Sequence, residues 1–533
     1  MSARSAPRAP RPRPALARRG APWVLLVLLA CSTPRGSEPA PRETLHVRSD
    51  VTGGGDGSAA RPFGGLAHAL AEVRGPARLT LGPGRFAAPA RWSGDHVVVG
   101  APEATLTLDT TLEPGAHLTL ERVVAEGRVV VPSGAELHAR SSTLTGALEI
   151  SGALLVDDLV LHARGPVGLA ARGATVSGAR LAIVGGEGVA RALRAEASRV
   201  TLTALRTWGG ATAGVQLDDG THANLAGLVV RDAPVSGVFV GRGVTATITD
   251  AVVTRAGRTA LLASRARLVV RGLEVDASPG AGVALLGVDA RLERLTLRAG
   301  ADPALTVDDH ALQPARVRAR DVRVEAGRAT AIRVGGGDVV IAGLTLRGPS
   351  ELRPGDPRPG AARGEDAVVA SGAGAKLTLD GATIVDAAGF AVGVYNDAEA
   401  HVEATIERPA LGGLRLESAA GPIELRATRV VRPRAGSCVE VLGALEVELD
   451  ALALDGCPEA GVLVGEGGTA RLRASRVLDA QRYGVAAFGG GELVVSGSIV
   501  RGVKLASFAA CGDDASVVDG GDNVWGGAVT RCP

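Results

Sequence analysis

Short clusters of acidic, histidine and tyrosine side chains are the residues of this 533-residue chain that could do acid–base chemistry. Two clusters hold a pair of adjacent aspartates beside a histidine, and a third holds a tyrosine beside an aspartate. Imidazoles and suitably placed carboxyls can hold or release protons near neutral pH, and two carboxyls can divide the roles of general acid and general base. The candidate polar residues are Asp218, Asp219, His222, Asp308, Asp309, His310, Tyr395 and Asp397.

The sequence around these clusters argues for solvated turns rather than for catalysis. Each cluster directly follows a short apolar alternation, where a turn is expected. The two Asp pairs occupy the same place in a repeat but stand four repeats apart, which is about 19 Å in stacked strands. The repeats beside Asp308 place Leu286-Gly287 and Gly335-Gly336 there, so they supply no helper group. We therefore assign no catalytic residue and no metal site, and we expect no cofactor.

The elements that would position a site come from an internal repeat. A small residue (Gly, Ala, Cys or Ser) opens fifteen segments between Gly168 and Ser507, and twelve of the fourteen spacings are 22 to 25 residues. When this residue is numbered 1, positions 2 and 4 are apolar nearly throughout, as in Val215 and Leu217. Such alternation predicts a strand with one buried face.

Each repeat carries a second alternation, as in ARLVVRGLEVDA from Ala266 to Ala277, so a unit holds two or three short strands. One unit cannot bury its own apolar face, whereas stacked units can, with equivalent strands paired in parallel. No repeat has a helical period, which excludes the helical solenoids. The sequence therefore predicts an all-β fold, a parallel β-helix (solenoid) with coils of about 23 residues.

The start of a β-helix needs a cap, because its first coil exposes apolar core and unpaired strand edges. In GGLAHALAEV, Leu66, Leu70 and Val73 fall on one face of a short helix that can cover this end. We interpret Asp56, in the preceding Gly-rich turn, as a turn-former. Calcium binding there would need a second carboxylate cluster, which the nearby sequence lacks.

The order of a strand, GxDGS, PF, a short helix and LTLGPGRF (Leu79 to Phe86) resembles the opening of the pectin-lyase-like β-helix superfamily, and in particular secreted bacterial parallel β-helix repeat proteins. The resemblance implies a right-handed helix. Families with this fold include polysaccharide lyases, polygalacturonases and uronan epimerases, whose catalytic groups cluster on the outer face of one sheet. The Asp-rich and Gly-His motifs of polygalacturonases and the Asp-Pro-His motif of epimerases are absent. The resemblance thus implies the fold without catalytic residues.

The alternation also predicts which residues cover one outer face. Positions 1 and 3 are expected to point outward when 2 and 4 point inward. Position 3 shows no carboxylate cluster, and we interpret Arg415 and Glu440 as a cross-coil ion pair of a surface ladder. Phe239, Leu262 and Ala284 form a mildly apolar stripe there. One spacing rises to 36 residues and leaves an insertion at 349–366, a place where solenoids often carry function.

The N-terminal residues indicate export. Residues 1–30 have an Arg-rich start and a ten-residue apolar core, APWVLLVLLA, which suits a signal peptide and is too short to span a bilayer. The following LLAC, ending at Cys31, resembles the bacterial lipobox, which implies lipidation of Cys31; an ordinary secretory signal is the alternative. We expect a tether at 31–44, and a lipid-anchored protein of the bacterial cell envelope, at the outer membrane or cell surface rather than the inner membrane.

The four remaining cysteines, Cys438, Cys457, Cys511 and Cys532, favour disulfides in an exported chain. Three pairings are possible. The local one joins Cys438 to Cys457 and Cys511 to Cys532, and each bridge would be worth roughly 3 kcal/mol. Zinc is the alternative, although no CxxC and no nearby His supports it. With these residues, the chain divides into an N-terminal cap (45–77), the β-helix (78–506) and a C-terminal cap (507–533).

Charge and composition limit the partners. Removing residues 1–30, which hold six Arg and no acid, takes the formal charge from +2 to −4, so the exported chain has no footprint for nucleic acid. We expect a monomer that contacts a polysaccharide or an envelope protein.

Two functions remain open from the sequence. The first is a non-catalytic envelope scaffold for glycan or protein; the second is a polysaccharide lyase, epimerase or hydrolase with an unrecognised site. Three or more ionisable groups converging on one outer groove would favour the enzyme, and a smooth exterior with an ordered 349–366 loop would favour the scaffold.

Overall fold

The computed structural model describes residues 43–533 apart from 187, 211, 277, 299, 301–302, 326–329, 349–365, 418–421, 444–445, 513 and 533. The chain divides into the units Met1–Ala40 and Pro41–Pro533, and only the second contains described residues. Two sequence predictions therefore lie outside the description, namely the lipidated Cys31 and all of the insertion except Asp366. None of the helices in the described part is long and apolar enough to cross a membrane.

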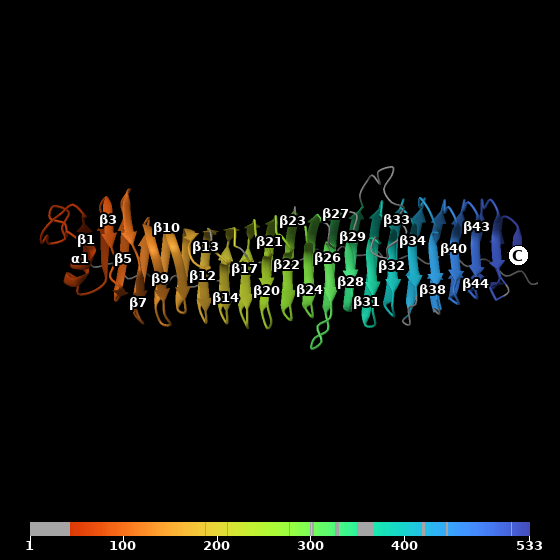
Figure 1. Cartoon of the computed structure of the whole chain (residues 1–533), viewed down its shortest axis with the longest axis horizontal. Helices are drawn as coiled ribbons and strands as arrows, with labels where there is room; N and C mark the ends of the chain where they lie inside the picture. The colour runs from red at the N-terminus through yellow and green to blue at the C-terminus, as the bar shows by residue number, and fades with distance from the viewer. Residues whose placement is uncertain are drawn as a thin grey trace, which may run out of the picture. The chain divides into compact units, whose positions relative to one another are not determined.

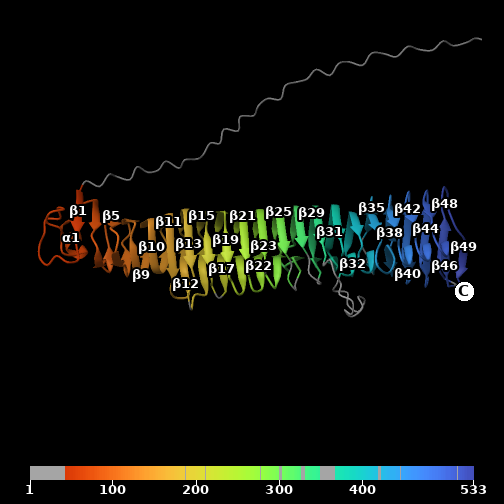
Figure 2. The same cartoon turned by 90° about the horizontal axis from the view of Figure 1, so that it is seen from above.

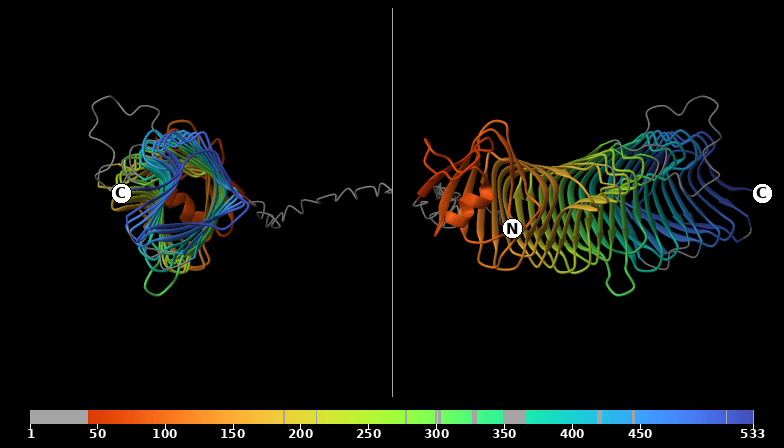
Figure 3. Two further views of the ribbon diagram at one scale, coloured as in Figure 1. Left: turned by 90° about the vertical axis from the view of Figure 1, so that its right-hand side faces the viewer. Right: turned by 60° about the vertical axis from the view of Figure 1, so that its left-hand side comes forward.

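The second unit is a right-handed parallel β-helix, as predicted. It has about 18 turns of about 23 residues, and its described residues form 49 strands and one short helix. Each strand pairs in parallel with the equivalent strand of the next coil (Figure 1). Seen end-on, the coils follow one another around a common interior (Figure 3). The first coils are joined through β1 (Glu43–Val47), β2 (Ala77–Leu81), β5 (Asp95–Gly100), β8 (His117–Glu121) and β10 (Glu136–Ile150).

Two sheets matter for function. The strands that open each repeat form what we call the repeat sheet: β12 (Val167–Arg172), β14 (Arg191–Glu196), β17 (Ala213–Asp218), β20 (Ser236–Val240), β22 (Thr259–Ser264), β24 (Ala281–Leu286), β26 (Leu305–Asp308), β28 (Ile332–Val334), β30 (Val368–Ser371), β32 (Phe390–Tyr395), β34 (Gly412–Glu417), β37 (Val439–Leu442), β40 (Ala460–Gly465), β43 (Tyr483–Phe488), β46 (Ala506–Cys511) and β49 (Val529–Cys532).

The second alternation of each repeat forms longer strands, which we call the long-strand sheet. Its central members follow one another along the same side in Figure 2. They are β11 (Ala153–Ala163), β13 (Thr175–Val184), β21 (Thr245–Thr254), β23 (Arg267–Asp276), β25 (Asp289–Arg298), β27 (Arg316–Glu325), β29 (Gly337–Arg347), β31 (Ala375–Val385) and β33 (Glu399–Glu407). In the other coils, two shorter strands take the place of one long strand.

Positions 2 and 4 face the core and position 3 faces outward, as predicted, but the prediction that position 1 points outward was wrong. Val215 and Leu217 are fully buried, and Gln216 between them is partly exposed. Position 1 is buried too. Strands β40 and β43 pair at Ala460 and Val462 but skip Gly461. A Cβ on Gly461 would lie 2.3 Å from Val477 Cγ1 and 2.6 Å from the Gly484 carbonyl oxygen. The residue is small because the strand bends into the core there.

Both ends of the described β-helix cover their core. Helix α1 (Leu66–Glu72) buries Leu66 and Ala69, and Leu70 and Val73 pack against the same core, which confirms the predicted capping helix. Asp56 accepts a hydrogen bond from the Ser58 amide at 3.0 Å, as a turn-former would. At the other end Phe508 and Trp525 meet edge-to-face, with ring centroids 5.6 Å apart.

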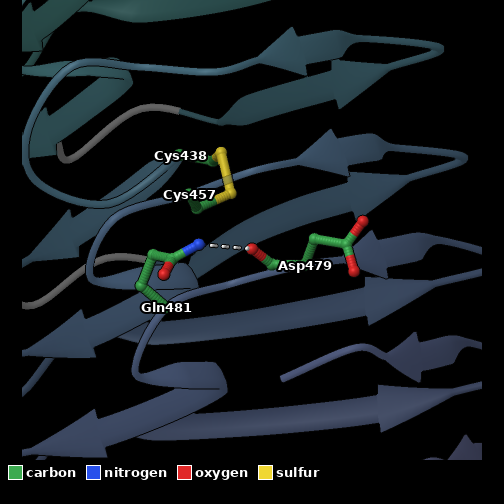
Figure 4. The surroundings of a disulfide bond; sticks show 4 residues. All are labelled: Cys438, Cys457, Asp479 and Gln481. Carbon is green, nitrogen blue, oxygen red and sulfur yellow. Dashed lines mark hydrogen bonds between the residues drawn. A yellow bond between two sulfur atoms is a disulfide. The ribbon is translucent and has the colours of Figure 1, made fainter. Parts of the chain in front are cut away.

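The local disulfide between Cys438 and Cys457 is present, with a Cα–Cα distance of 5.5 Å (Figure 4). Cys438 occupies position 1 of its repeat, and both cysteines are fully buried. In the next coil the Gln481 amide donates to the Asp479 carbonyl at 3.4 Å. Cys511 is also disulfide-bonded, and the register of β46 and β49 places Cys532 opposite it.

Candidate functional site

The Asp218 group lies in a polar network at the C-terminal end of strand β17. The Asp218 carboxylate accepts hydrogen bonds from Gln216 Nε2 at 2.6 Å and from Arg194 Nε at 3.3 Å. Asp219 has a positive φ of 36° and forms the turn after the strand, and His222 begins the next strand on its exposed side. The structure therefore gives Asp218 a partner set of amide and guanidinium groups, without His222.

The Asp308 group belongs to a turn that projects from the coil. The Asp309 carboxylate accepts from the Ala315 amide at 2.6 Å, and His310 Nδ1 accepts from the Leu312 amide at 3.2 Å. His310 and Gln313 form an antiparallel bridge across this turn. These contacts satisfy the backbone of the turn, which is the structural role considered for this cluster.

The Tyr395 group divides between a turn and the outer face of the repeat sheet. Asn396 and Asp397 have positive φ angles of 51° and 64° and form the turn. Tyr395 instead turns back over its own strand, and its hydroxyl donates a short hydrogen bond to Asp366 Oδ2. Both side chains are 4% exposed. The Asp366 Oδ1 atom accepts from the Phe390 amide at 3.0 Å, so both carboxylate oxygens are bonded.

A glycine makes room for this contact. A Cβ on Gly393 would lie 2.4 Å from the Tyr395 ring and 2.5 Å from Asp366 Oδ2. Gly393 is the position-3 residue of its repeat, so a larger side chain there would displace the phenol and the carboxylate.

Arg415, Glu417 and Glu440 continue the cluster on the next two coils. Arg415 and Glu440 are direct register partners on β34 and β37. Arg415 Nε lies 3.3 Å from Glu417 Oε2, and its guanidinium carbon lies 5.6 Å from the centroid of the Phe390 ring. Together these residues and the Asp366–Tyr395 pair form what we call the 366–440 cluster. Asp366 lies two residues before β30, and the other members lie on the next three strands of the repeat sheet, β32, β34 and β37, of which β32 and β34 are labelled in Figure 1.

The surroundings of Glu440 and Tyr395 raise the pKa values of these two side chains. Burial raises the pKa of the Glu440 carboxyl above its ordinary value, against the opposing effect of nearby Arg415; the charges of Glu459 and Asp366 add to the rise. Burial, followed by the charge of Asp366, raises the pKa of the Tyr395 phenol far above its ordinary value. Tyr395 therefore stays protonated and donates to Asp366, and the raised pKa of Glu440 favours the protonated form of its carboxyl.

The geometry can divide acid and base between two carboxyls. Glu417 and Glu440 are diagonal neighbours on adjacent strands, which places their Cα atoms about 8 Å apart. In an inverting glycosidase one carboxyl protonates the leaving oxygen and a second activates a water molecule on the other face of the sugar ring. Arg415 lies between them, in contact with Glu417 and opposite Glu440.

Sequence reasoning found one member of the cluster and interpreted two others differently. Tyr395 was a candidate, and Arg415 and Glu440 were interpreted as a surface ladder. Asp366 and Glu417 were missed. Asp366 is the last residue of the insertion and so lies outside the repeat pattern. Glu417 occupies position 5, where only the three clusters with Asp or Tyr were considered as candidates. Reading positions 3 and 5 of consecutive repeats together would have found Arg415, Glu417 and Glu440.

No protein-family model and no curated protein sequence matches the chain. Among solved structures, it is similar to a rhamnogalacturonan lyase, with 9% identity, a TM-score of 0.32 and coverage of 52% of this chain and 84% of that one. It is also similar to the catalytic domain of a GH87 α-1,3-glucanase in complex with tetrasaccharides, with 12% identity and a TM-score of 0.34. This match covers 91% of this chain and 70% of that one. An alginate lyase from Paenibacillus sp. str. FPU-7 is similar with 16% identity and a TM-score of 0.26, and the match covers 58% of this chain and 91% of that one. With TM-scores below 0.5, these similarities assign neither an activity nor a substrate to this chain.

Proposed function

We propose that the chain is a polysaccharide-active enzyme that hydrolyses glycosidic bonds at the 366–440 cluster. The observation that carries the proposal is the diagonal pair of Glu417 and Glu440, with a raised pKa for one carboxyl and an arginine between the two. Five ionisable groups gather on one outer face of the repeat sheet, and this supports the enzyme over the non-catalytic scaffold.

In this mechanism Glu440 is the general acid. Its raised pKa keeps a proton available for the leaving oxygen of the scissile bond, and that proton is transferred as the bond to the sugar carbon breaks. Glu417 accepts a proton from a water molecule that attacks the opposite face of the sugar ring. After both steps Glu440 is ionised and Glu417 is protonated, and exchange with solvent restores the starting state.

The remaining residues of the cluster position the acids. Arg415 holds Glu417 by an ion pair and stacks against the Phe390 ring. Asp366 binds both the Phe390 amide and the Tyr395 hydroxyl, so it fixes the strand that carries the ring. A chain of contacts thus runs from Asp366 through Phe390 to Arg415.

The test is activity on a panel of acidic and neutral polysaccharides, with and without calcium, read as product sizes by mass spectrometry. We expect new oligosaccharides from at least one substrate, and a loss of about 10²–10⁴-fold in kcat for Glu440→Gln. The matched control is Glu492→Gln, which removes an exposed carboxylate from another strand. Absence of products across the panel, or equal activity of the two variants, would refute the proposal. Products with 4,5-unsaturated ends would show that the enzyme cleaves by elimination, as a lyase, rather than by hydrolysis.

We also propose that the mature chain is held in the bacterial envelope through lipid on Cys31, as its lipobox-like stretch suggests. Cys31→Ser should release the protein from the membrane fraction into the soluble exported fraction. Equal membrane association of the variant and the wild type would refute lipidation as the anchor.

A further inference from the structure

The long-strand sheet carries a concentration of positive charge away from the 366–440 cluster. Strands β25 and β27 together hold seven arginines and four acids, a formal net charge of +3. The exported chain as a whole, with residues 1–30 removed, is at −4. The six exposed members, which we call the arginine patch, are Arg291, Arg294, Arg316, Arg318, Arg320 and Arg323.

A shallow hollow of about 290 Å³ lies within this patch. Its floor crosses three neighbouring strands, β25, β27 and β29, where Thr296, Arg323 and Thr345 are in register. Arg294 stands at its edge. Gly343, with a positive φ of 68°, leaves the corner of the hollow without a side chain.

The guanidinium groups of the patch are only partly neutralised. Arg320 pairs with Glu293 at 2.9 Å, and Arg294 lies 3.5 Å from Asp250. The guanidinium groups of Arg291, Arg316 and Arg323 make no hydrogen bond or ion pair with any residue that the structure describes. Asp321 is the one acid that lines the hollow, against two arginines there. The hollow therefore has a net positive charge and free N–H donors.

We propose that the hollow binds a carboxylate or sulfate group of an acidic polysaccharide. Guanidinium groups form paired hydrogen bonds with such planar or tetrahedral anions, and the threonine hydroxyls on either side of Arg323 can bond sugar hydroxyls. No aromatic side chain lines the hollow, and stacking on such rings is a main feature of single-stranded nucleic acid binding. The proposal goes beyond the hydrolytic function, because this sheet differs from the one that carries the carboxyl pair.

The test is binding of the full chain carrying Glu440→Gln, so that a substrate is not consumed. The probes are polygalacturonate for carboxylate, dextran sulfate for sulfate, dextran as the neutral polymer and single-stranded oligothymidylate. The Arg294→Gln/Arg323→Gln double variant should bind the preferred acidic polysaccharide at least 10-fold more weakly. The matched control is Arg429→Gln/Arg476→Gln, which removes two exposed arginines from other coils.

The control should retain affinity within about twofold, and binding should weaken as salt rises. A preference for dextran sulfate over polygalacturonate, or the reverse, identifies the anion. The proposal is overturned by equal loss in both double variants, by unchanged affinity in the Arg294/Arg323 variant, by equal binding to dextran, or by tighter binding to the oligothymidylate. Thermal unfolding of each variant excludes misfolding as the cause. Binding is measured without turnover, so it can fail while hydrolysis succeeds, and the reverse.

Discussion

At the scale of single residues, Glu417 and Glu440 show how neighbouring strands give one residue type two environments. Both are on the outer face of the repeat sheet, and Arg415 is adjacent to each. Glu417 makes the ion pair, whereas Glu440 has its pKa raised by burial in spite of the arginine. In the proposed mechanism this difference makes Glu440 the proton donor and Glu417 the proton acceptor, with Arg415 between them.

The raised pKa of Glu440 predicts a pH-dependent stability. The folded pKa lies above the ordinary value of 4.5, so the folded state binds more protons than the unfolded state between these two values. The contribution of Glu440 is therefore most favourable below 4.5 and is lost as the pH rises through the folded pKa. Glu440→Gln should raise Tm relative to wild type at pH 8 but not at pH 4. Parallel melting curves at both pH values, with Glu492→Gln as control, check this; an equal Tm difference at the two values would contradict it.

At the scale of the elements, the corners of the coils are held by a row of buried serine hydroxyls that ends in a partly buried asparagine amide. The Leu452 amide donates to Ser475 Oγ at 3.0 Å, and the Ser475 amide donates to Ser498 Oγ at 3.1 Å. The Ser498 amide donates in turn to Asn523 Oδ1 at 2.8 Å. Each side chain thus satisfies a backbone N–H of the previous coil at the point where the strands bend.

Removing one hydroxyl of this row should lower the stability of the folded protein. Ser498→Ala leaves the buried Ser475 amide without its acceptor, and we expect a loss of about 1–3 kcal/mol in the free energy of unfolding. Urea denaturation with the disulfides intact measures the loss, and faster hydrogen exchange at the Ser475 amide would locate it. Ser496→Ala, two residues away and partly exposed, is the control and should change stability by less than about 0.5 kcal/mol. Equal effects of the two substitutions would contradict the role of the row.

At the scale of the whole β-helix unit, stability depends on how the terminal coils are closed, because each coil contacts mainly its neighbours. Helix α1 closes the N-terminal end through Leu66, which is 2% exposed. The Phe508–Trp525 pair packs against the core at the other end, and the Trp525 indole donates to Asp519 at 3.0 Å.

A charge placed beneath the helical cap should open the N-terminal end. Leu66→Asp should lower stability by at least about 2–5 kcal/mol, the range for loss of a buried leucine side chain, and expose apolar core and strand edges. Size-exclusion chromatography with light scattering should then show higher oligomers. Ala67→Asp places the same charge on the exposed side of the helix and should remain monomeric. A monomeric, stable Leu66→Asp variant would show that the cap is dispensable.

The fold was predictable because it depends on a repeated pattern, and the candidate site was less so because it depends on irregularities. The spacing of small residues and the apolar positions 2 and 4 predicted coils, strands and parallel pairing. The prediction that position 1 points outward was wrong because strict alternation assumes a straight strand, whereas the strand bends at Gly461.

The site was found only in part for a related reason. Asp366 reaches the outer face from the end of an insertion, and its contact with Tyr395 requires the gap left by Gly393. Such a contact joins residues 29 positions apart through one missing side chain, and no periodic pattern encodes it. The pKa of Glu440 likewise depends on burial by neighbouring coils, which a single repeat does not reveal.

Because every coil pairs in register with the next, the β-helix can become longer or shorter only by whole coils. Ser236 and Thr259 are register partners, as are Val238 and Leu261. Excision of residues 237–259 would join Ser236 directly to Ala260, the position-1 residue of the following repeat, and leave every remaining strand with an equivalent neighbour. Genes for such chains can therefore lengthen or shorten by one coil without redesign of the rest, and the distance between two distant surface sites becomes adjustable in increments of about 4.8 Å.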